Sequence, residues 1–476
     1  MGTSSANSLD QTLAGQIFSS KEIRANLEIL CDDFGSRFAG TESEKKAALF
    51  LHDKLRAYGL EDVRSEAFEY CGWTRGTARL KVTSPWQREL SCLSMPMSPP
   101  GRAAGKIVDL GNGAPETFAA MDGELRGNIA LVSIANPVEA ARWIQRTEKY
   151  NRTMLAGASA FIFMGDEAGY GPVTGALGFN QWGLIPGIMI SKETGLLLRR
   201  LIQRHGMAAV EIETTDTTCR KTSWNIIGDV KGSADSAETV VIGAHYDGHD
   251  IAQGAHDPAS GLVAALAAAQ ALAQGTERPK HNLRFILFGV EELGLIGAHA
   301  YVDGHCEQLD FTRFMLNMDA AGGPGSKILS LYGHDTRTYF RTMAADIDEE
   351  FTVDMDRSPL REPDHLSADH YPFMAQGLPC AFIRQLELSV ASGFYHTAHD
   401  TVDKVRAIDI KEAAYLCARL VWRVADDGNW PFKRTSQEEQ TRAQTEYDKS
   451  EVRAIEKAVE QLRQQVKKGA KKSAEV

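Results

Sequence analysis

The sequence has no long hydrophobic segment, no excess of basic residues and no recognisable leader. Its uninterrupted apolar runs stay below the about 18 residues that a membrane-spanning helix needs. Lys and Arg total 52 against 63 Asp and Glu, for a formal net charge of -11. We therefore expect neither a nucleic-acid partner nor binding to a membrane. The start, MGTSSANSLDQTLAGQIF, lacks a basic stretch followed by an apolar core, so we expect a cytoplasmic protein, or a secreted or periplasmic one if a leader was removed.

Cysteine is also scarce, and its spacing is uninformative for metal binding. Seven cysteines are spread along the chain, they include no CxxC pair, and their number is odd. This pattern favours buried or free thiols over a disulfide framework, although one or two bridges would be compatible with it.

The character of the sequence changes along its 476 residues, a length that suggests two or three domains of about 150 residues. Residues 15–100 and 216–430 combine helical and strand patterns, and we predict one α/β domain with a mixed, mostly parallel sheet sandwiched by helices. Residues 101–215 contain short β-type runs between Gly-rich turns, without a cluster of catalytic residue types. We predict that they form a small β-rich domain inserted into the α/β domain.

The last part of the chain, 431–476, is highly charged and is predicted to be a helical tail. Apolar residues recur there at alternating spacings of three and four, which is a short heptad stripe. This stripe either docks on its own chain or forms a homodimer contact. Its members are Val452, Ile455, Val459, Leu462 and Val466.

Metal-capable side chains follow three apolar runs between residues 240 and 319. These runs have the composition of buried strands, and in an open α/β sheet the side chains after the strand ends gather at one edge. A further carboxylate, Asp257, precedes Pro258 at the predicted start of an Ala/Leu-rich helix. The side chains that follow the strands are His245, the pair Glu291 and Glu292, and Asp319.

Singly, each of these motifs is more often a structural or solvated feature, but their combination indicates a metal site. Two imidazoles and three carboxylates suit zinc, cobalt or manganese. Five ligands exceed the need of one catalytic zinc, and they suit two ions if Asp257 bridges them. Two such ions would hold a hydroxide and polarise the carbonyl that it attacks. The predicted ligands are His245, Asp257, Glu292, Asp319 and His396.

Two neighbouring carboxylates complete the predicted chemistry. Glu291 adjoins the ligand Glu292, so it can reach the same site and act as the general base that moves the proton of the water to the leaving amine. Asp247 follows His245 closely, and we predict that its carboxylate accepts the ring N–H of that histidine and orients the imidazole.

These motifs resemble those of the dizinc aminopeptidases, a family that includes aminopeptidase Y, bacterial leucyl aminopeptidases, glutamate carboxypeptidases and carboxypeptidase Q. The similar segments are GAHYDG, GAHDPASG, VEELGLIGAHAY, NMDA, DHYPF and YHTAHDT, in the family order. The resemblance implies a peptide substrate, two zinc ions held by the five predicted ligands, Glu291 as base and Asp247 as orienting acid. By the same resemblance VDLGNG, LRGNIALV, AGASAFIFM and IPGIMISKETG imply a protease-associated domain in the inserted region.

The chain departs from the family pattern before DHYPF, where Ala368 replaces the usual Ser. The family's partner for the oxyanion has no clear match. His365, His370 and Tyr371 are candidates, and each could instead pack or bond the backbone. Arg384 could bind a substrate carboxylate, or serve as a structural ion-pair partner.

The leading interpretation is an exopeptidase that removes N-terminal residues from peptides. A dipeptidase or carboxypeptidase, as in carboxypeptidase Q and the glutamate carboxypeptidases, is the alternative within the hydrolases. A non-catalytic receptor is disfavoured because such relatives lose metal ligands, which are all present here. A glutaminyl cyclase, which uses a single zinc, is disfavoured by the same complete ligand set.

Overall fold

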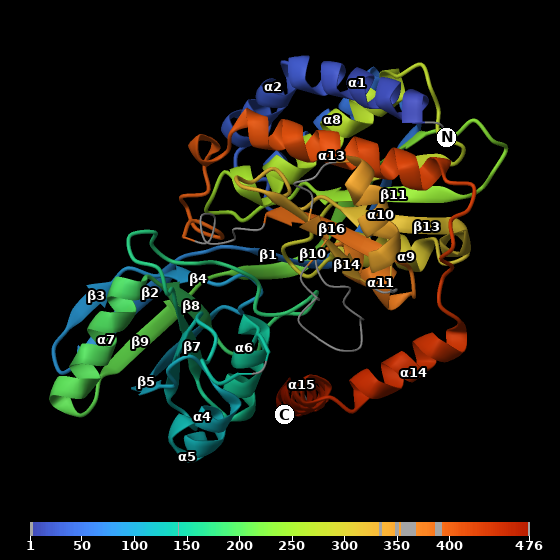
Figure 1. Ribbon diagram of the computed structural model, residues 1–476. Helices are drawn as coiled ribbons and strands as arrows, with labels where there is room; N and C mark the ends of the chain where they lie inside the picture. The colour runs from blue at the N-terminus through green and yellow to red at the C-terminus, as the bar shows by residue number, and fades with distance from the viewer. Residues whose placement is uncertain are drawn as a thin grey trace. The chain divides into compact units, whose positions relative to one another are not determined.

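The computed structural model describes residues 3–140, 142–332, 336–347, 352–353, 368–385 and 393–474. The chain divides into two compact units, whose elements are labelled in Figure 1. The first unit contains Met1–Tyr70 and Lys221–Arg442, and the second contains Cys71–Arg220 and Ala443–Val476. The chain therefore leaves the first unit after Tyr70, returns to it at Lys221, and ends in the second unit.

A mixed sheet is the centre of the first unit. Within the described residues its strand order is β1-β10-β12-β11-β13-β16-β14-β15. The central strands β12, β11, β13 and β16 run parallel, and β10 and β14 lie antiparallel to their neighbours β12 and β16. The strands are β1 (Glu61–Thr74), β10 (Thr217–Val230), β11 (Thr239–His245), β12 (Asn282–Phe288), β13 (Thr312–Asn317), β14 (Lys327–Tyr332), β15 (Thr352–Val353) and β16 (Cys380–Gln385).

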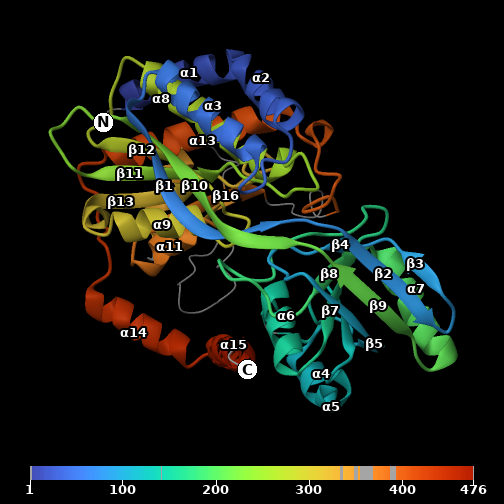
Figure 2. The same cartoon turned by 180° about the vertical axis from the view of Figure 1, so that it is seen from behind.

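Helices cover both faces of this sheet, as Figures 1 and 2 show from opposite sides. Along β11, Val240 and Ile242 pack into the larger apolar cluster, with α1, α2, α3, α8 and α13. Val241 points to the opposite face and joins α9 and α11. Because the strand is covered on both faces, its residues 240–244 are all apolar. The predicted fold class is confirmed. The helices are α1 (Thr3–Ser19), α2 (Glu22–Glu28), α3 (Glu42–Tyr58), α8 (Gly261–Gln274), α9 (Ile296–Gly304), α10 (Arg337–Ile347), α11 (His370–Ala375) and α13 (Ala407–Asp426).

Helix α3 shows how local sequence sets the ends of an element. The Thr41 side chain accepts the backbone N–H of Glu44 at 3.2 Å and caps the first turn. Gly59 ends the helix with φ 90°, a left-handed conformation that suits glycine. The Glu44 carboxylate accepts the backbone N–H of Gly40 at 2.5 Å and the hydroxyl of Ser223, so it joins the helix start to β10.

The second unit is built on its own sheet, in the order β3-β2-β9-β5-β6-β7-β8-β4 within the described residues. Strands β5 to β8 pair in parallel, and β9 lies antiparallel to both β2 and β5. The strands are β2 (Ala78–Ser84), β3 (Arg88–Leu90), β4 (Leu93–Ser94), β5 (Gly101–Asp109), β6 (Ile129–Ser133), β7 (Ala160–Met164), β8 (Gly187–Ile190) and β9 (Ala209–Thr214). The helices are α4 (Pro115–Ala120), α5 (Asp122–Leu125), α6 (Arg146–Leu155) and α7 (Lys192–His205).

The charged end of the chain forms α14 (Gln437–Asp448) and α15 (Glu451–Ala474). Helix α15 packs against α6, and Arg152 pairs with Glu451 at 2.7 Å. Ile455 and Val459 of the stripe are buried, whereas Val466 is 51% exposed. The N-terminal part of the stripe therefore docks on its own chain, and the homodimer contact stays a prediction.

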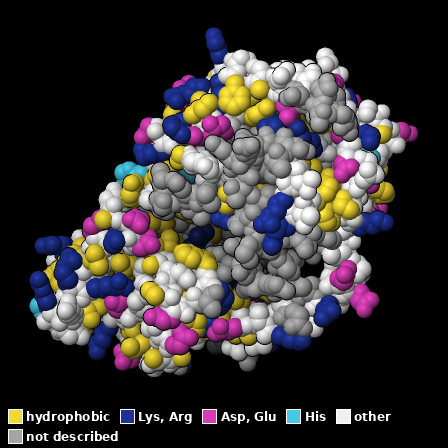
Figure 3. Space-filling view, viewed as in Figure 1, with side chains coloured by type: hydrophobic (Ala, Val, Ile, Leu, Met, Phe, Trp, Pro, Cys, Tyr) yellow, Lys and Arg dark blue, Asp and Glu magenta, His cyan; other side chains and the backbone are white. Residues whose placement is uncertain are grey.

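The described surface carries side chains of both charges. On the face shown in Figure 3, Lys and Arg side chains are interspersed with Asp and Glu.

Among the described helices, none is both long and apolar enough to cross a membrane. The described residues include every cysteine, and each is a free thiol, as predicted.

Candidate metal centre

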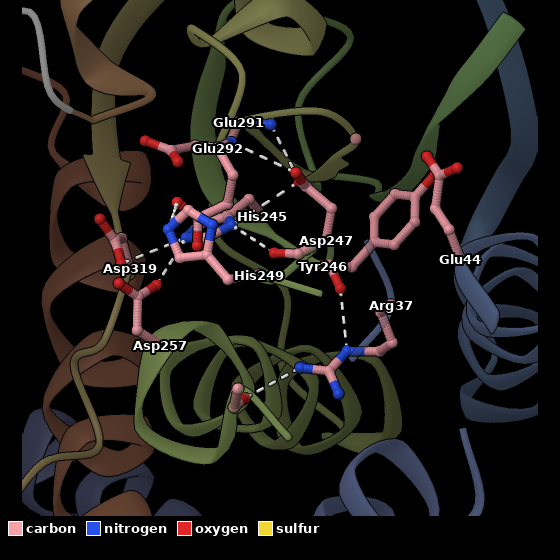
Figure 4. A network of polar contacts seen from close by, with 12 residues as sticks. Arg37, Glu44, His245, Tyr246, Asp247, His249, Asp257, Glu291, Glu292 and Asp319 are labelled. Carbon is pink, nitrogen blue, oxygen red and sulfur yellow. Dashed lines mark hydrogen bonds and ion pairs between the residues drawn. The ribbon is translucent and has the colours of Figure 1, made fainter. Parts of the chain in front are cut away.

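The predicted ligands that follow the strands lie together at one edge of the first unit's sheet (Figure 4). His245 is the last residue of β11, and Asp319 follows the end of β13. Glu291 and Glu292 follow β12. Because β11, β12 and β13 are parallel neighbours, their carboxyl ends deliver these side chains to the same place.

The first group of ligand-type atoms consists of His245, Asp257 and Asp319. His245 Nε2 lies 3.2 Å from Asp257 Oδ1 and 3.3 Å from Asp319 Oδ1. The other ring nitrogen, Nδ1, lies 3.0 Å from the main-chain carbonyl of Asp247 and donates to it. With Nδ1 so engaged, Nε2 is the atom that faces the two carboxylates.

The second group consists of Glu292, His396 and a residue that the sequence analysis missed, His249. Glu292 Oε2 lies 2.8 Å from His249 Nε2 and 3.7 Å from His396 Nε2. All three residues are buried. The signal for His249 was its place in the loop directly after His245, where a second histidine could turn back to the same strand end.

Asp257 lies between the two groups. Its Oδ1 faces His245, and its Oδ2 lies 3.3 Å from His396 Nε2. The backbone of Asp257 is extended, with φ -119° and ψ 105°, and helix α8 begins only at Gly261. The residue therefore precedes the helix on a separate turn, and each of its carboxylate oxygens faces a different histidine.

Burial and the neighbouring charges shift the pKa of several members of this cluster. Although burial raises the pKa of Asp257, the His245 and His396 side chains hold it well below its usual value. Burial raises the pKa of Glu292 to about 8. Burial also raises the pKa of Glu291 well above its usual value, and the charges of Glu292 and Asp369 add to this effect. Burial lowers the pKa of His245, but the nearby carboxylates outweigh it and raise the pKa well above normal.

The donor set fits divalent cations. Among the described residues, Glu292 Oε1 and both carboxylate oxygens of Asp369 have no hydrogen-bond partner. Within the same residues, the cluster's carboxylates form ion pairs with histidine and none with Lys or Arg. Buried carboxylates in such excess need compensation, and a bound cation supplies it. The buried carboxylates are Asp247, Asp257, Glu291, Glu292 and Asp369, and the partly buried one is Asp319.

Asp247 holds the turn that carries Glu291 and Glu292. Its carboxylate oxygens accept the backbone N–H groups of Glu291 at 2.9 Å and Glu292 at 3.2 Å. The carboxylate lies 3.7 Å from His245 Nδ1, farther than the main-chain carbonyl of the same residue. The carboxylate therefore anchors the turn that carries both glutamates, and the main-chain carbonyl is the nearer partner of the imidazole. The orienting role of the Asp247 carboxylate toward His245 stays a prediction.

Several turns in the centre have left-handed backbone conformations at residues other than glycine. Val290, directly before Glu291, has φ 61°, and Ala320, directly after Asp319, has φ 47°. His396 itself has φ 56°. Each such residue costs about 1–3 kcal/mol and persists only where the surroundings impose it. The strain accompanies the placement of a ligand-type side chain at each of the three turns.

Arg37 ties two ligand-bearing loops together from inside the unit (Figure 4). Its guanidinium is fully buried and donates to main-chain carbonyls in three segments. One of these carbonyls belongs to the loop after β11, and two belong to the segment before Asp257. The acceptors are the carbonyl oxygens of Leu30, Gly35, Tyr246, Gln253 and Gly254, at 2.6–3.0 Å.

The predicted oxyanion candidates occupy packed surroundings where they are described. His365 lies outside the described residues. The His370 ring lies 4.4 Å from that of Tyr332, and Tyr371 packs against the apolar cluster beneath α9. Arg384 donates from Nε to the Ser330 hydroxyl on the neighbouring strand at 2.7 Å.

Asp369, which the sequence analysis did not select, is fully buried near the cluster. Burial raises its pKa well above the usual value, although the charge of His245 opposes the shift. The charges of Asp319, Asp247 and Glu292 raise it further, which places Asp369 among the other acidic groups of the centre.

Comparison with known proteins agrees with this geometry. Residues 225–421 match Peptidase family M28, and residues 98–198 match the PA domain. The chain is 29% identical to Aminopeptidase YwaD of Bacillus subtilis over 414 residues, 85% of each chain. It is 26% identical to Carboxypeptidase Q of Mus musculus over 310 residues, 62% of this chain and 64% of that one.

A solved structure shares the fold. The zinc aminopeptidase BSAP from Bacillus subtilis has a TM-score of 0.65 and 26% identity, covering 86% of this chain and 95% of its own. The resemblances that the sequence motifs suggested, to the aminopeptidase family and to the protease-associated domain, are thereby confirmed. Residues 225–421 thus have the sequence of a peptidase family M28 metallo-exopeptidase, and residues 98–198 that of a PA domain inserted into the peptidase domain.

Proposed function

We propose that this protein is an aminopeptidase that holds two zinc ions and removes N-terminal residues from peptides. The observation that carries the proposal is the position of Asp257, whose two carboxylate oxygens face His245 and His396 separately. One carboxylate can thus serve two ions at once. Aminopeptidase YwaD and the zinc aminopeptidase BSAP, to which this chain is similar, support the same assignment.

The ligands divide between two positions. His245 and Asp319 would complete one position, and Glu292 and His396 the other, with Asp257 shared between them. When bound, the two zinc ions would polarise the carbonyl of the scissile peptide bond and acidify a water molecule.

Glu291 is placed to move the proton. Its carboxylate would take a proton from the attacking water as the new C–O bond forms, and deliver it to the nitrogen of the leaving amine as the peptide C–N bond breaks. The raised pKa of Glu291, caused first by burial, suits a group that must hold the proton between these two steps. Asp247 keeps Glu291 in position through the backbone N–H at 2.9 Å.

The surplus of carboxylates also favours a substrate with a free α-ammonium group. Glu291 and Asp369, which are not among the proposed ligands, are buried and acidic, and a positively charged N-terminus would be attracted to them. The alternative, a carboxypeptidase or dipeptidase, has the similarity to Carboxypeptidase Q in its favour. Arg384, the candidate for binding a substrate carboxylate, is hydrogen bonded to Ser330 on the neighbouring strand.

Three versions of one pentapeptide separate these activities. The first has both ends free, the second is N-acetylated and the third is C-terminally amidated. We expect the free and amidated peptides to lose their N-terminal residue and the acetylated one to resist cleavage. Rapid cleavage of the acetylated peptide from its C-terminus would establish the carboxypeptidase alternative instead. Elemental analysis of the same preparation should give about two zinc ions per chain.

A further inference from the structure

His249 lies where a metal ligand would, although it is absent from the five-ligand set inferred from the sequence. It is 2% exposed, and its Nε2 lies 2.8 Å from Glu292 Oε2. Its ring is 4.1 Å from the ring of His396, at an interplanar angle of 77°. Figure 4 shows His249 beside Glu292 and the other side chains of the centre, not turned away from them.

The atoms of this group are spaced as the ligands of one ion would be. One ligand atom each from His249, Glu292 and His396 lies within 4.8 Å of the others. Ligands about 2.0–2.1 Å from one zinc ion are separated by about 3.3 Å in tetrahedral geometry. Small side-chain rotations would therefore bring both imidazoles and the carboxylate onto a common ion.

We propose that His249 is a metal ligand at the position shared by Glu292, His396 and Asp257. This proposal rests on the two-ion function above and adds a ligand to one of its positions. The two positions then differ in their donors. One has a single imidazole with two carboxylates, and the other has two imidazoles with two carboxylates.

This difference has a chemical consequence. An imidazole nitrogen favours zinc, copper and nickel, whereas carboxylate oxygen suits magnesium and manganese. The position with His249 should therefore bind zinc or cobalt more tightly and release it to a chelator last. The other position should lose its ion first and exchange it more readily for manganese.

His249 could instead donate a hydrogen bond to Glu292 and orient it without touching an ion. A lower metal affinity in a His249 variant does not distinguish a metal ligand from an orienting group, because removal of either weakens metal binding. A direct count of the imidazoles bound to metal does distinguish them, and it needs no variant.

The decisive measurement is proton NMR of the full-length protein loaded with cobalt(II). Each cobalt-bound imidazole gives one hyperfine-shifted, exchangeable N–H resonance. We expect three such resonances with two cobalt ions bound, from His245, His249 and His396. Two resonances with two ions bound would overturn the His249 assignment while leaving the two-ion function intact. Binding of fewer than two ions would contradict the function itself.

Substitution provides a second test. In His249→Ala, we expect the affinity for one of the two cobalt ions to fall at least about tenfold. The affinity for the other cobalt ion should stay within about twofold of the wild-type value. His249→Gln can still donate to Glu292, so a ligand role predicts no recovery in this variant. Full recovery by Gln would overturn the proposal. His205→Ala, at the exposed end of α7, is the matched control and should leave both affinities unchanged.

Discussion

The carboxylate of Asp400 holds the backbone of Asp257, a residue 143 positions away in the chain, through a hydrogen bond of 3.1 Å from the Asp257 N–H. The other oxygen of Asp400 accepts the N–H of His256 at 2.7 Å. Asp400 is itself buried, and it lies close after His396 in the chain. The loop that supplies His396 thus also fixes the backbone of Asp257, whose carboxylate faces that histidine.

Replacement of Asp400 should therefore disturb both metal positions at once. In Asp400→Ala we expect the affinity for each of the two ions to fall by about 10- to 100-fold, because Asp257 is shared between them. Titration of the metal-free protein with cobalt measures both affinities. Asp403→Ala, in the same loop with a side chain 70% exposed, should bind both ions normally. A loss confined to one ion would argue against a bridging Asp257.

Glu291→Gln should remove the general base but leave the bound zinc in place. We expect kcat to fall by about 10²- to 10⁴-fold, the usual contribution of a general acid–base group. Zinc content by elemental analysis should stay at the wild-type value, since Glu291 is not among the proposed ligands. Glu277→Gln is the control, because that side chain is exposed in the segment between α8 and β12. Wild-type turnover in Glu291→Gln would exclude Glu291 as the base.

Arg37→Met should destabilise the first unit. Its five hydrogen bonds to main-chain carbonyls would be lost, and those carbonyls would stay buried. We expect the free energy of unfolding to fall by about 3 kcal/mol or more. Urea unfolding in the presence of a chelator measures this without a contribution from metal binding. Arg24→Met should change it by less than about 1 kcal/mol, because that side chain is 52% exposed in a surface pair.

Glu44 should make stability depend on pH. Burial raises its pKa from 4.5 to about 7, so between these values the folded protein holds a proton that the unfolded chain has released. Stability therefore falls as pH rises through this window, by up to about 3 kcal/mol at about 1.4 kcal/mol per unit.

The variant Glu44→Gln lacks this contribution. Relative to wild type, its free energy of unfolding should rise between pH 5 and pH 7.5, as measured by urea titration with a chelator present. Glu42 is an exposed position on the same helix. The free energy of unfolding of Glu42→Gln should therefore equal that of wild type at both pH 5 and pH 7.5. A constant difference between Glu44→Gln and wild type across the window would show that Glu44 is ionised throughout.

Much of the fold could be read from local patterns. Apolar runs identified β11, β12 and β13 because strands covered on both faces are nearly continuous runs of apolar residues. The cap at Thr41 and the stop at Gly59 marked α3 because both depend on neighbouring residues alone. Ligand-type residues after the strands indicated the centre, since parallel strands bring their carboxyl ends to one edge.

The finer arrangement required the folded chain. The separate histidines facing the two oxygens of Asp257, the anchoring of Glu291 by Asp247 and the support from Asp400 are contacts between distant segments. A local pattern carries no information about which distant segment a buried polar group meets, because that depends on the path of the whole chain. The sequence by itself determined the residue types and the sheet edge where they gather. Only the tertiary structure decided how they group, and it alone brought His249 among them.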